Sequence, residues 1–186
     1  MLKLLKKFPA AGILVLIFFL SSCADNRIAF SPESGSYEIL LEENAWTVAG
    51  ARHMWELQLT RTDKSLTVMI NYYRKEAVAE AGASDLNGFI RFFRTLGIVS
   101  GLYDDPSSQV HDLVDMAPRD MRGSPAISGK RQRITSLNPQ IDAAAEIIFL
   151  EMDDFYFAIT YHAKASEFRA AQSIINDLVR NLRMKV

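Results

Sequence analysis

Acidic side chains gather in one part of the chain, and their types would suit a metal ion. The stretch from residue 104 to residue 120 contains Asp104, Asp105, His111, Asp112, Asp115 and Asp120. Carboxylate oxygens in a turn-rich segment can bind Ca²⁺, and the imidazole of His111 could bind a transition metal. The spacing fits neither an EF-hand loop nor HExxH, and acidic residues often lie in solvated turns. The first five of these residues are therefore metal candidates that compete with an ordinary solvated loop.

Side chains for nucleophilic catalysis lack the arrangement that they need. A hydrolytic serine requires a strained elbow such as GxSxG, and the sequence contains none. His53, His111 and His162 are scattered, and no pair has metal-ligand spacing. We therefore expect no catalytic residue and no cofactor, and we favour binding over catalysis. The alternative is an envelope enzyme or a divalent-metal-binding protein that uses residues 104–120.

A group of basic side chains overlaps and follows this stretch, namely Arg119, Arg122, Lys130, Arg131 and Arg133. They could meet lipid headgroups, lipopolysaccharide phosphates or an acidic partner. Arg131 and Arg133 would share one face of a strand. The simpler interpretation is an edge strand that charge protects from pairing. A third function class, a ligand carrier, would need an apolar cavity larger than about 300 Å³ between sheet and helix.

The N-terminal segment has the composition of a secretory signal. Lys3, Lys6 and Lys7 precede an apolar run at residues 8–20. That run is much shorter than the roughly 20 residues that a helix needs to cross the hydrocarbon core. A charged start, a short apolar middle and small residues before a cleavage site are typical of a signal peptide. A short membrane anchor or a buried helix is the alternative.

The end of this segment, LSSC at residues 20–23, resembles the bacterial lipobox and contains the chain's only cysteine. The resemblance implies that residues 1–22 are removed as a signal peptide and that Cys23 is the site of lipid attachment. Two or three acyl chains would anchor the protein stably. In many Gram-negative bacteria an Asp directly after such a cysteine retains the lipoprotein in the inner membrane. Ala24 stands at that position here, which implies the outer membrane, facing the periplasm, in a Gram-negative host.

The remaining chain has the size of one domain. Cleavage before Cys23 would leave 164 residues with 18 basic and 22 acidic side chains, a net charge of −4. Nucleic-acid-binding proteins are usually basic, so we expect no nucleic-acid partner. Residues 23–36, a lipidated cysteine followed by a polar, turn-rich segment, are expected to form a flexible tether. Residues 37–186 are long enough to bury the core of a single α+β domain.

Alternating polarity predicts strands through much of this domain. Residues 54–60 and 66–74 alternate apolar with polar side chains around a turn-forming segment, and we expect a β-hairpin there. Further strands are expected at residues 37–41, 46–48, 127–135, 144–152 and 155–161. Asp153 and Asp154 would form the tight turn between the last two.

Two segments have the spacing of amphipathic helices. Ser84 is a suitable N-cap for a helix whose apolar residues run from Leu86 to Leu96. Ser166 is expected to cap a second helix, with one apolar stripe formed by Phe168, Ala171, Ile175, Leu178, Val179 and Leu182. Residues 100–126 lack periodicity, and we expect a long loop with a short strand near residues 110–114. Loops of this length are often functional.

This order of elements predicts an α+β fold, a mainly antiparallel sheet with amphipathic helices packed on it. The hairpin EIIFLEMDDFYFAITYHA followed by SEFRAAQSIINDLVRNLRM looks like the end of the PsbP-like sandwich, and EENAWTV is similar to its opening. The resemblance could cover residues 37–184 and implies an α/β/α sandwich. It also implies a binding or assembly module, and it carries over no catalytic residue. We therefore expect a lipid-anchored cell-envelope lipoprotein whose partners are the membrane, through its N-terminal lipid, and an envelope protein.

Overall fold

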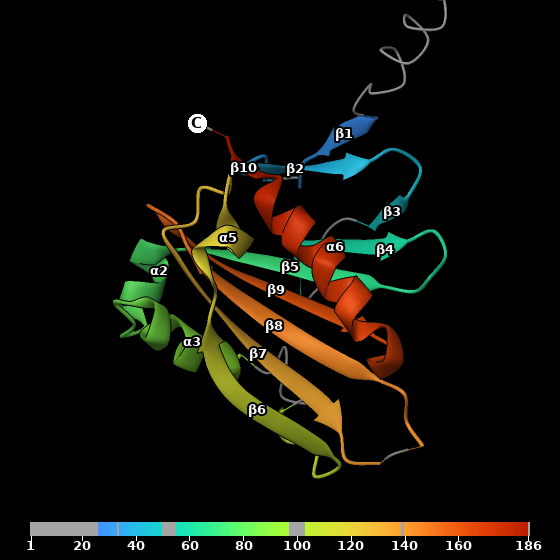
Figure 1. Ribbon diagram of the computed structural model, residues 1–186. Coiled ribbons are helices and arrows are strands. Elements are labelled where there is room, and N and C mark those ends of the chain that lie inside the picture. The colour runs from blue at the N-terminus through green and yellow to red at the C-terminus, as the bar shows by residue number, and fades with distance from the viewer. Residues whose placement is uncertain (1–25, 33, 50–54, 97–102, 139, 186) are drawn as a thin grey trace, which may run out of the picture.

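Seven antiparallel strands form the main sheet of this protein. The computed structural model describes residues 26–32, 34–49, 55–96, 103–138 and 140–185 (Figure 1). In spatial order the strands are β3 (Trp46–Ala49), β4 (Leu57–Arg61), β5 (Thr67–Arg74), β9 (Phe155–Ala163), β8 (Ala144–Glu151), β7 (Ser128–Ser136) and β6 (Ser108–Asp115). A smaller sheet has the order β1 (Arg27–Phe30), β2 (Tyr37–Glu42) and β10 (Leu182–Met184).

Helices cover both faces of the main sheet. The helices of the described residues are α2 (Lys75–Glu80), α3 (Leu86–Thr95), α5 (Pro118–Met121) and α6 (Phe168–Arg180), and a 3₁₀ turn at Ala165–Glu167 leads into α6. Figure 1 shows α6 and α5 in front of the sheet and α3 behind it. The expected α+β fold, a mainly antiparallel sheet between amphipathic helices, is confirmed.

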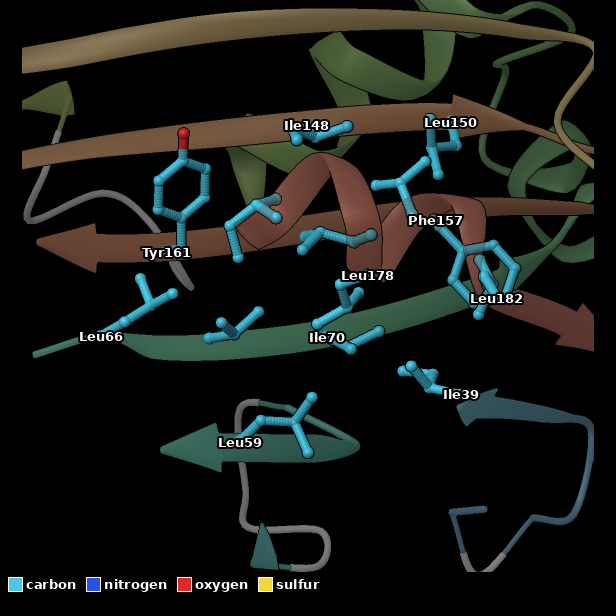
Figure 2. Close-up of a cluster of buried hydrophobic side chains, with 14 of the residues drawn as sticks. Ile39, Leu59, Leu66, Ile70, Ile148, Leu150, Phe157, Tyr161, Leu178 and Leu182 are labelled. Carbon is cyan, nitrogen blue, oxygen red and sulfur yellow. The ribbon is translucent and has the colours of Figure 1, made fainter. Parts of the chain in front are cut away.

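Two apolar cores follow from this layering. On the α6 side, Ile70, Ile148, Phe157 and Leu178 belong to one buried cluster, which Figure 2 shows between the helix and the strands. On the α3 side, a second cluster contains Phe89, whose ring stacks on that of Tyr156 with centroids 4.7 Å apart. Because both faces of β8 and β9 are covered, these strands are buried along nearly their whole length.

Most expected elements lie where their periodicity predicts them. Leu57↔Ile70 and Leu59↔Val68 pair in the β4–β5 hairpin, as the alternation predicts. The stripe on the last helix is also confirmed, with Ile175 and Val179 fully buried in the α6-side core. Leu182, assigned to the same stripe, contributes to that core from β10 because α6 ends at Arg180.

The helix starts differ from their predicted caps. Asp85, not Ser84, is the N-cap of α3, because its carboxylate accepts a 2.6 Å hydrogen bond from the Gly88 amide. Ser166 lies inside the 3₁₀ turn, and its amide and hydroxyl both donate to Asp142, at 2.9 and 2.6 Å. Asp and Ser are comparable N-cap residues, and at α3 it is the Asp85 carboxylate that reaches the third amide of the helix.

The tether and the long loop contain more regular structure than expected. Residues 27–30, within the expected tether, form β1 and pair with β2. Residues 108–115 form an eight-residue edge strand, β6, and residues 118–121 form α5. The signal segment and Cys23 lie outside the described residues. Among the described helices, none is long and apolar enough to cross a membrane.

Candidate binding groove

An open groove of about 560 Å³ lies between α6, the small sheet and the β3–β4 hairpin. Its charged lining consists of Arg27, Glu42, Arg61, Asp177 and Arg180, and its apolar lining includes Leu40, Trp46 and Ile174. Figure 1 shows β1, β2 and the C-terminal end of α6 at one end of the molecule, with β3 beside them. Segments far apart in the sequence therefore meet at this groove.

The β3–β4 hairpin places an aromatic ring and a guanidinium on one wall. Trp46 pairs directly with Arg61 across the two strands, and directly opposed side chains in an antiparallel pair interact. The Arg61 guanidinium carbon lies 5.6 Å from the centre of the Trp46 ring. Its Nε lies 3.7 Å from a carboxylate oxygen of Asp63. This wall therefore offers a flat apolar surface beneath a fixed positive charge.

The C-terminal half of α6 supplies the opposite wall. Residues 173, 177 and 180 follow one another at helical spacing and line the groove, while Ile175 and Val179 face the core. Arg27 reaches across from β1, with its Nη2 3.6 Å from an Asp177 carboxylate oxygen. Arg180 Nε donates a 3.1 Å hydrogen bond to the Asn176 carbonyl. Three guanidiniums and two carboxylates thus border the groove.

The lining chemistry is suited to binding. Guanidiniums make bidentate, charge-assisted hydrogen bonds to carboxylates and phosphates. Trp and Arg are also the residues that most often dominate binding energy at protein interfaces. Of the described residues that line the groove, Ser173 alone carries a hydroxyl and none is histidine, cysteine or lysine. A nucleophile with an adjacent base, which acyl or hydrolytic chemistry needs, is not among these side chains.

A buried polar network holds α6 in place beside the groove. Glu146 on β8 is 2% exposed and accepts a 2.7 Å hydrogen bond from the Tyr161 hydroxyl and a 3.3 Å bond from Gln172 of α6. Arg131 lies 3.8 Å from Glu146 and donates a 3.0 Å bond to Asn176 of α6. Burial and the nearby Glu146 charge raise the pKa of Tyr161, so the phenol stays protonated and donates.

Arg131, a member of the predicted basic group, belongs to this buried network. Arg131 and Arg133 share a strand face, as predicted. Arg131 is largely buried beneath α6, whereas Arg133 is exposed, and its guanidinium carbon is 4.2 Å from the centre of the Phe168 ring. Lys130 points to the other face, where its Nζ lies 2.6 Å from Asp115. Arg131 and Arg133 therefore stabilise the α6 interface.

The metal candidates lie along and before the edge strand β6, and the structure gives several of them protein partners. Asp105 accepts hydrogen bonds from the Ser107 amide and hydroxyl, and these bonds lower its pKa. His111 Nε2 lies 2.9 Å from the Thr135 hydroxyl oxygen. Asp104 is exposed, and Asp112 lies at an irregularity in the β6–β7 register. Within the described ranges, no three His, Cys, Asp or Glu side chains are placed to hold a metal ion. A metal site at residues 104–120 stays a prediction.

A smaller pocket of about 180 Å³ lies near the start of β6, bordered by Asp105, Ser136 and His162. Burial lowers the pKa of His162, so this imidazole is held neutral more strongly than a solvated one. The ligand-carrier hypothesis required an apolar cavity between sheet and helix. The large groove instead has a mixed charged and apolar lining and is open to solvent.

Sequence reasoning missed the groove because its residues come from separate elements, namely β1, β2, the β3–β4 hairpin and α6. Arg27 fell in the expected tether, and Arg180 lies outside the apolar stripe by which the last helix was recognised. Trp46 was the one available signal, since it stands in the EENAWTV segment that resembles the opening of PsbP-like domains. No local pattern pairs it with Arg61 in the groove.

Comparisons with known proteins agree on the fold. No family model and no curated protein matches the sequence. Among solved structures, the chain is similar to cyanobacterial PsbP (CyanoP) from Synechocystis sp. PCC 6803, with 8% identity and a TM-score of 0.57 over 97% of this chain and 99% of that one. It is also similar to the Ran-binding protein Mog1p of Saccharomyces cerevisiae, with 8% identity and a TM-score of 0.55 over 87% and 96%.

A third similar structure is LpqN of Mycobacterium tuberculosis, a protein involved in cell envelope biogenesis. The identity is 7%, the TM-score is 0.54, and the match covers 92% of this chain and 97% of LpqN. Sequence identities this low show the fold alone. The described part of this chain therefore has a PsbP-like fold, the antiparallel sandwich shared by the CyanoP, Mog1p and LpqN structures.

Proposed function

We propose that this chain is a lipid-anchored envelope protein whose domain binds a partner through the groove between α6 and the β3–β4 hairpin, without catalysis. The groove carries the proposal, because it combines Trp46 with Arg27, Arg61 and Arg180 in a space of about 560 Å³. That combination of aromatic and guanidinium groups suits recognition of an acidic or amphipathic surface.

The similar structures support a binding or assembly role. Mog1p is described as a Ran-binding protein, and LpqN as a protein involved in cell envelope biogenesis. By analogy, the proposal assigns this chain to the envelope, with an envelope protein as partner and no nucleic acid. The lipobox resemblance adds the outer membrane, facing the periplasm, as the location in a Gram-negative host.

Lipid anchoring is tested by changing Cys23 to Ala in the full chain and expressing both forms in the native host. We expect the wild-type protein to stay with the membrane after a carbonate wash and the C23A form to be released or left with its leader attached. Mass spectrometry of the mature terminus should find an acylated Cys23. An unmodified thiol on a membrane-retained protein would contradict this proposal.

Partner binding is tested with a photo-crosslinking amino acid placed at Ser173, which lines the groove. The control position is Arg91, exposed on α3 at the opposite face of the sheet. Irradiation of native membranes should give a discrete adduct from Ser173 and none from Arg91, and R61Q should weaken it. Equal adducts from both positions, or an adduct that R61Q leaves unchanged, would refute the groove as the binding site.

A further inference from the structure

The smaller pocket near the start of β6 lies apart from the groove. Its walls come from the residues before β6, the last residues of β7 and β9 and the first residues of β8. In the main sheet, β5 and β9 separate β8 from the β3–β4 hairpin. Figure 1 shows the β7–β8 connection at the end of the molecule that is remote from β1. A partner bound in the groove therefore leaves this pocket free.

The size and the lining of the pocket suit a single apolar side chain. Its volume of about 180 Å³ is well below the roughly 300–1,000 Å³ of sites that hold drug-sized ligands. Ile134, Ile141 and the alanines at positions 143, 144 and 145 make most of its lining apolar. Ile134 and Ala145 belong to the α3-side core, so the pocket continues that core to the surface.

Exposed hydrophobic side chains surround the pocket. Ile141, which lines it, is exposed, and so are Val110 and Leu137. Val110 pairs with the lining residue Ile134 across β6 and β7. The Leu137 amide donates a 2.6 Å hydrogen bond to the carbonyl of Ser107, which also lines the pocket. Apolar side chains that gather around one pocket, unlike scattered ones, mark an interaction site.

The wall of the pocket also offers a hydrogen-bonding group. Among the described residues, none makes a hydrogen bond to the ring of His162. Burial lowers the pKa of His162, so the ring is neutral at physiological pH. A neutral imidazole has one donor and one acceptor nitrogen. An occupant with a polar edge could therefore pair with it.

The rim of the pocket is acidic. Asp105 lines it, Asp104 is the exposed residue before it, and Asp142 stands between two lining residues. Hydroxyl and amide donors of Ser107 lower the pKa of Asp105, and those of Ser166 lower the pKa of Asp142. Both carboxyls are therefore charged at physiological pH.

The positive side chains near this rim leave its charge uncompensated. Lys164 lies 3.2 Å from Glu167, which offsets its charge. Arg133, two residues before the lining residue Thr135, places its guanidinium over the Phe168 ring on the α6 side of the sheet. The rim therefore keeps a net negative charge.

We propose that this pocket receives one aromatic side chain, Tyr or Trp, from a basic segment of a partner protein. The ring fills the apolar walls, and its hydroxyl or indole N–H reaches His162. Lysines or arginines beside it meet the acidic rim, which favours this partner over acidic ones. A single aromatic anchor in a pocket ringed by apolar contacts is a common way to concentrate binding energy. This site does not depend on lipid anchoring or on the groove.

The test uses the full chain, purified in zwitterionic detergent micelles and labelled at its alanine methyl groups for NMR. Ala144 and Ala145 report on the pocket, and Ala45, next to the groove residue Trp46, reports on the groove. The probes are three blocked tripeptides, Lys-Trp-Lys, Glu-Trp-Glu and Lys-Gly-Lys. We expect Lys-Trp-Lys to shift Ala144 and Ala145 in a saturable way, and the other two to bind several-fold more weakly.

Two variants have matched controls. A143L places a larger side chain in the pocket from an exposed position and should weaken Lys-Trp-Lys binding about tenfold, the value of one buried apolar side chain. Its control is A170L, exposed on α6. D104N should weaken binding roughly two- to fivefold, and D153N, in the turn at the other end of β8, should leave it unchanged.

Several outcomes would overturn the inference. Equal binding of Lys-Gly-Lys would show that the ring contributes nothing, and equal binding of Glu-Trp-Glu would show that the rim does not select a basic partner. Lys-Trp-Lys shifts confined to Ala45 would assign the peptide to the groove. Absence of any shift at Ala144 and Ala145 in the wild-type protein would exclude the pocket, whether or not the variants fold.

Discussion

Replacement of Glu146 by Ala tests whether the buried network stabilises the wall of the groove. Glu146 is 2% exposed and accepts hydrogen bonds from Tyr161 at 2.7 Å and Gln172 at 3.3 Å, with Arg131 at 3.8 Å. In E146A the Tyr161 hydroxyl loses its acceptor and the half-buried Arg131 loses one of its carboxylates. Removing one partner of a buried charged pair typically costs about 3–5 kcal/mol.

The lower end of that range applies here. Arg131 keeps its 3.0 Å bond to Asn176 and its 3.8 Å contact with Asp120 in the variant, so its charge is not left alone. We therefore expect E146A to lower the free energy of unfolding by about 3 kcal/mol. For a domain of this size that is a fall in Tm of roughly 6–12 °C. Because Gln172 and Asn176 belong to α6, amide exchange should accelerate most in α6.

The assay is a urea titration of the mature protein, followed by tryptophan fluorescence, together with hydrogen exchange. The control is E167A, which removes the exposed pair between Lys164 and Glu167 at 3.2 Å and should cost less than about 1 kcal/mol. If E146A were no less stable than E167A, Glu146 would contribute nothing net to the fold. Exchange that accelerated uniformly over the domain would refute its specific role at α6.

G129A should destabilise the fold by about 1–3 kcal/mol in the same titration, because an added Cβ would lie 2.9 Å from the Met121 sulfur and 3.0 Å from Leu150; unchanged stability would show that these side chains move aside freely. Burial lowers the pKa of His162, so the unfolded chain takes up this proton at a higher pH, and stability should fall as the pH drops below about 7. H162Q should flatten that slope, and an unchanged slope would assign it elsewhere. Because Asp115 is already paired with Lys130, we expect metal analysis of the dialysed protein to find no stoichiometric divalent ion, and a bound ion that D115N removes would instead support the alternative of a metal site at residues 104–120.

Local pattern was enough for the elements that have a clear period. The alternation through β4, β5, β8 and β9 and the stripe on α6 predict which side chains each element buries, because a strand repeats every two residues and a helix every 3.6. The antiparallel sandwich then follows from the need to cover these apolar faces. The metal candidates at residues 104–120 rested on residue types alone and stay a prediction, and β6 was expected as a short strand within a loop.

The parts that sequence reasoning missed depend on distant partners. β1 and β10 have four and three residues, too few for a period, and each exists because β2 offers it an edge. The cap of α3 is the local exception, because it depended on whether the Ser84 or the Asp85 side-chain oxygen reached the Gly88 amide.

By itself, the sequence determined the layered fold, the buried faces and the expectation of an anchored, non-catalytic protein. Only the tertiary structure decided that Arg27, Trp46, Arg61 and Arg180 border one groove, and that Arg131 and Arg133 contact α6. The physical reason is the distance along the sequence between the residues that encode each feature. Burial pattern is encoded by neighbours a few residues apart, whereas a site assembled from β1, the β3–β4 hairpin and α6 is encoded by pairings that no single segment contains.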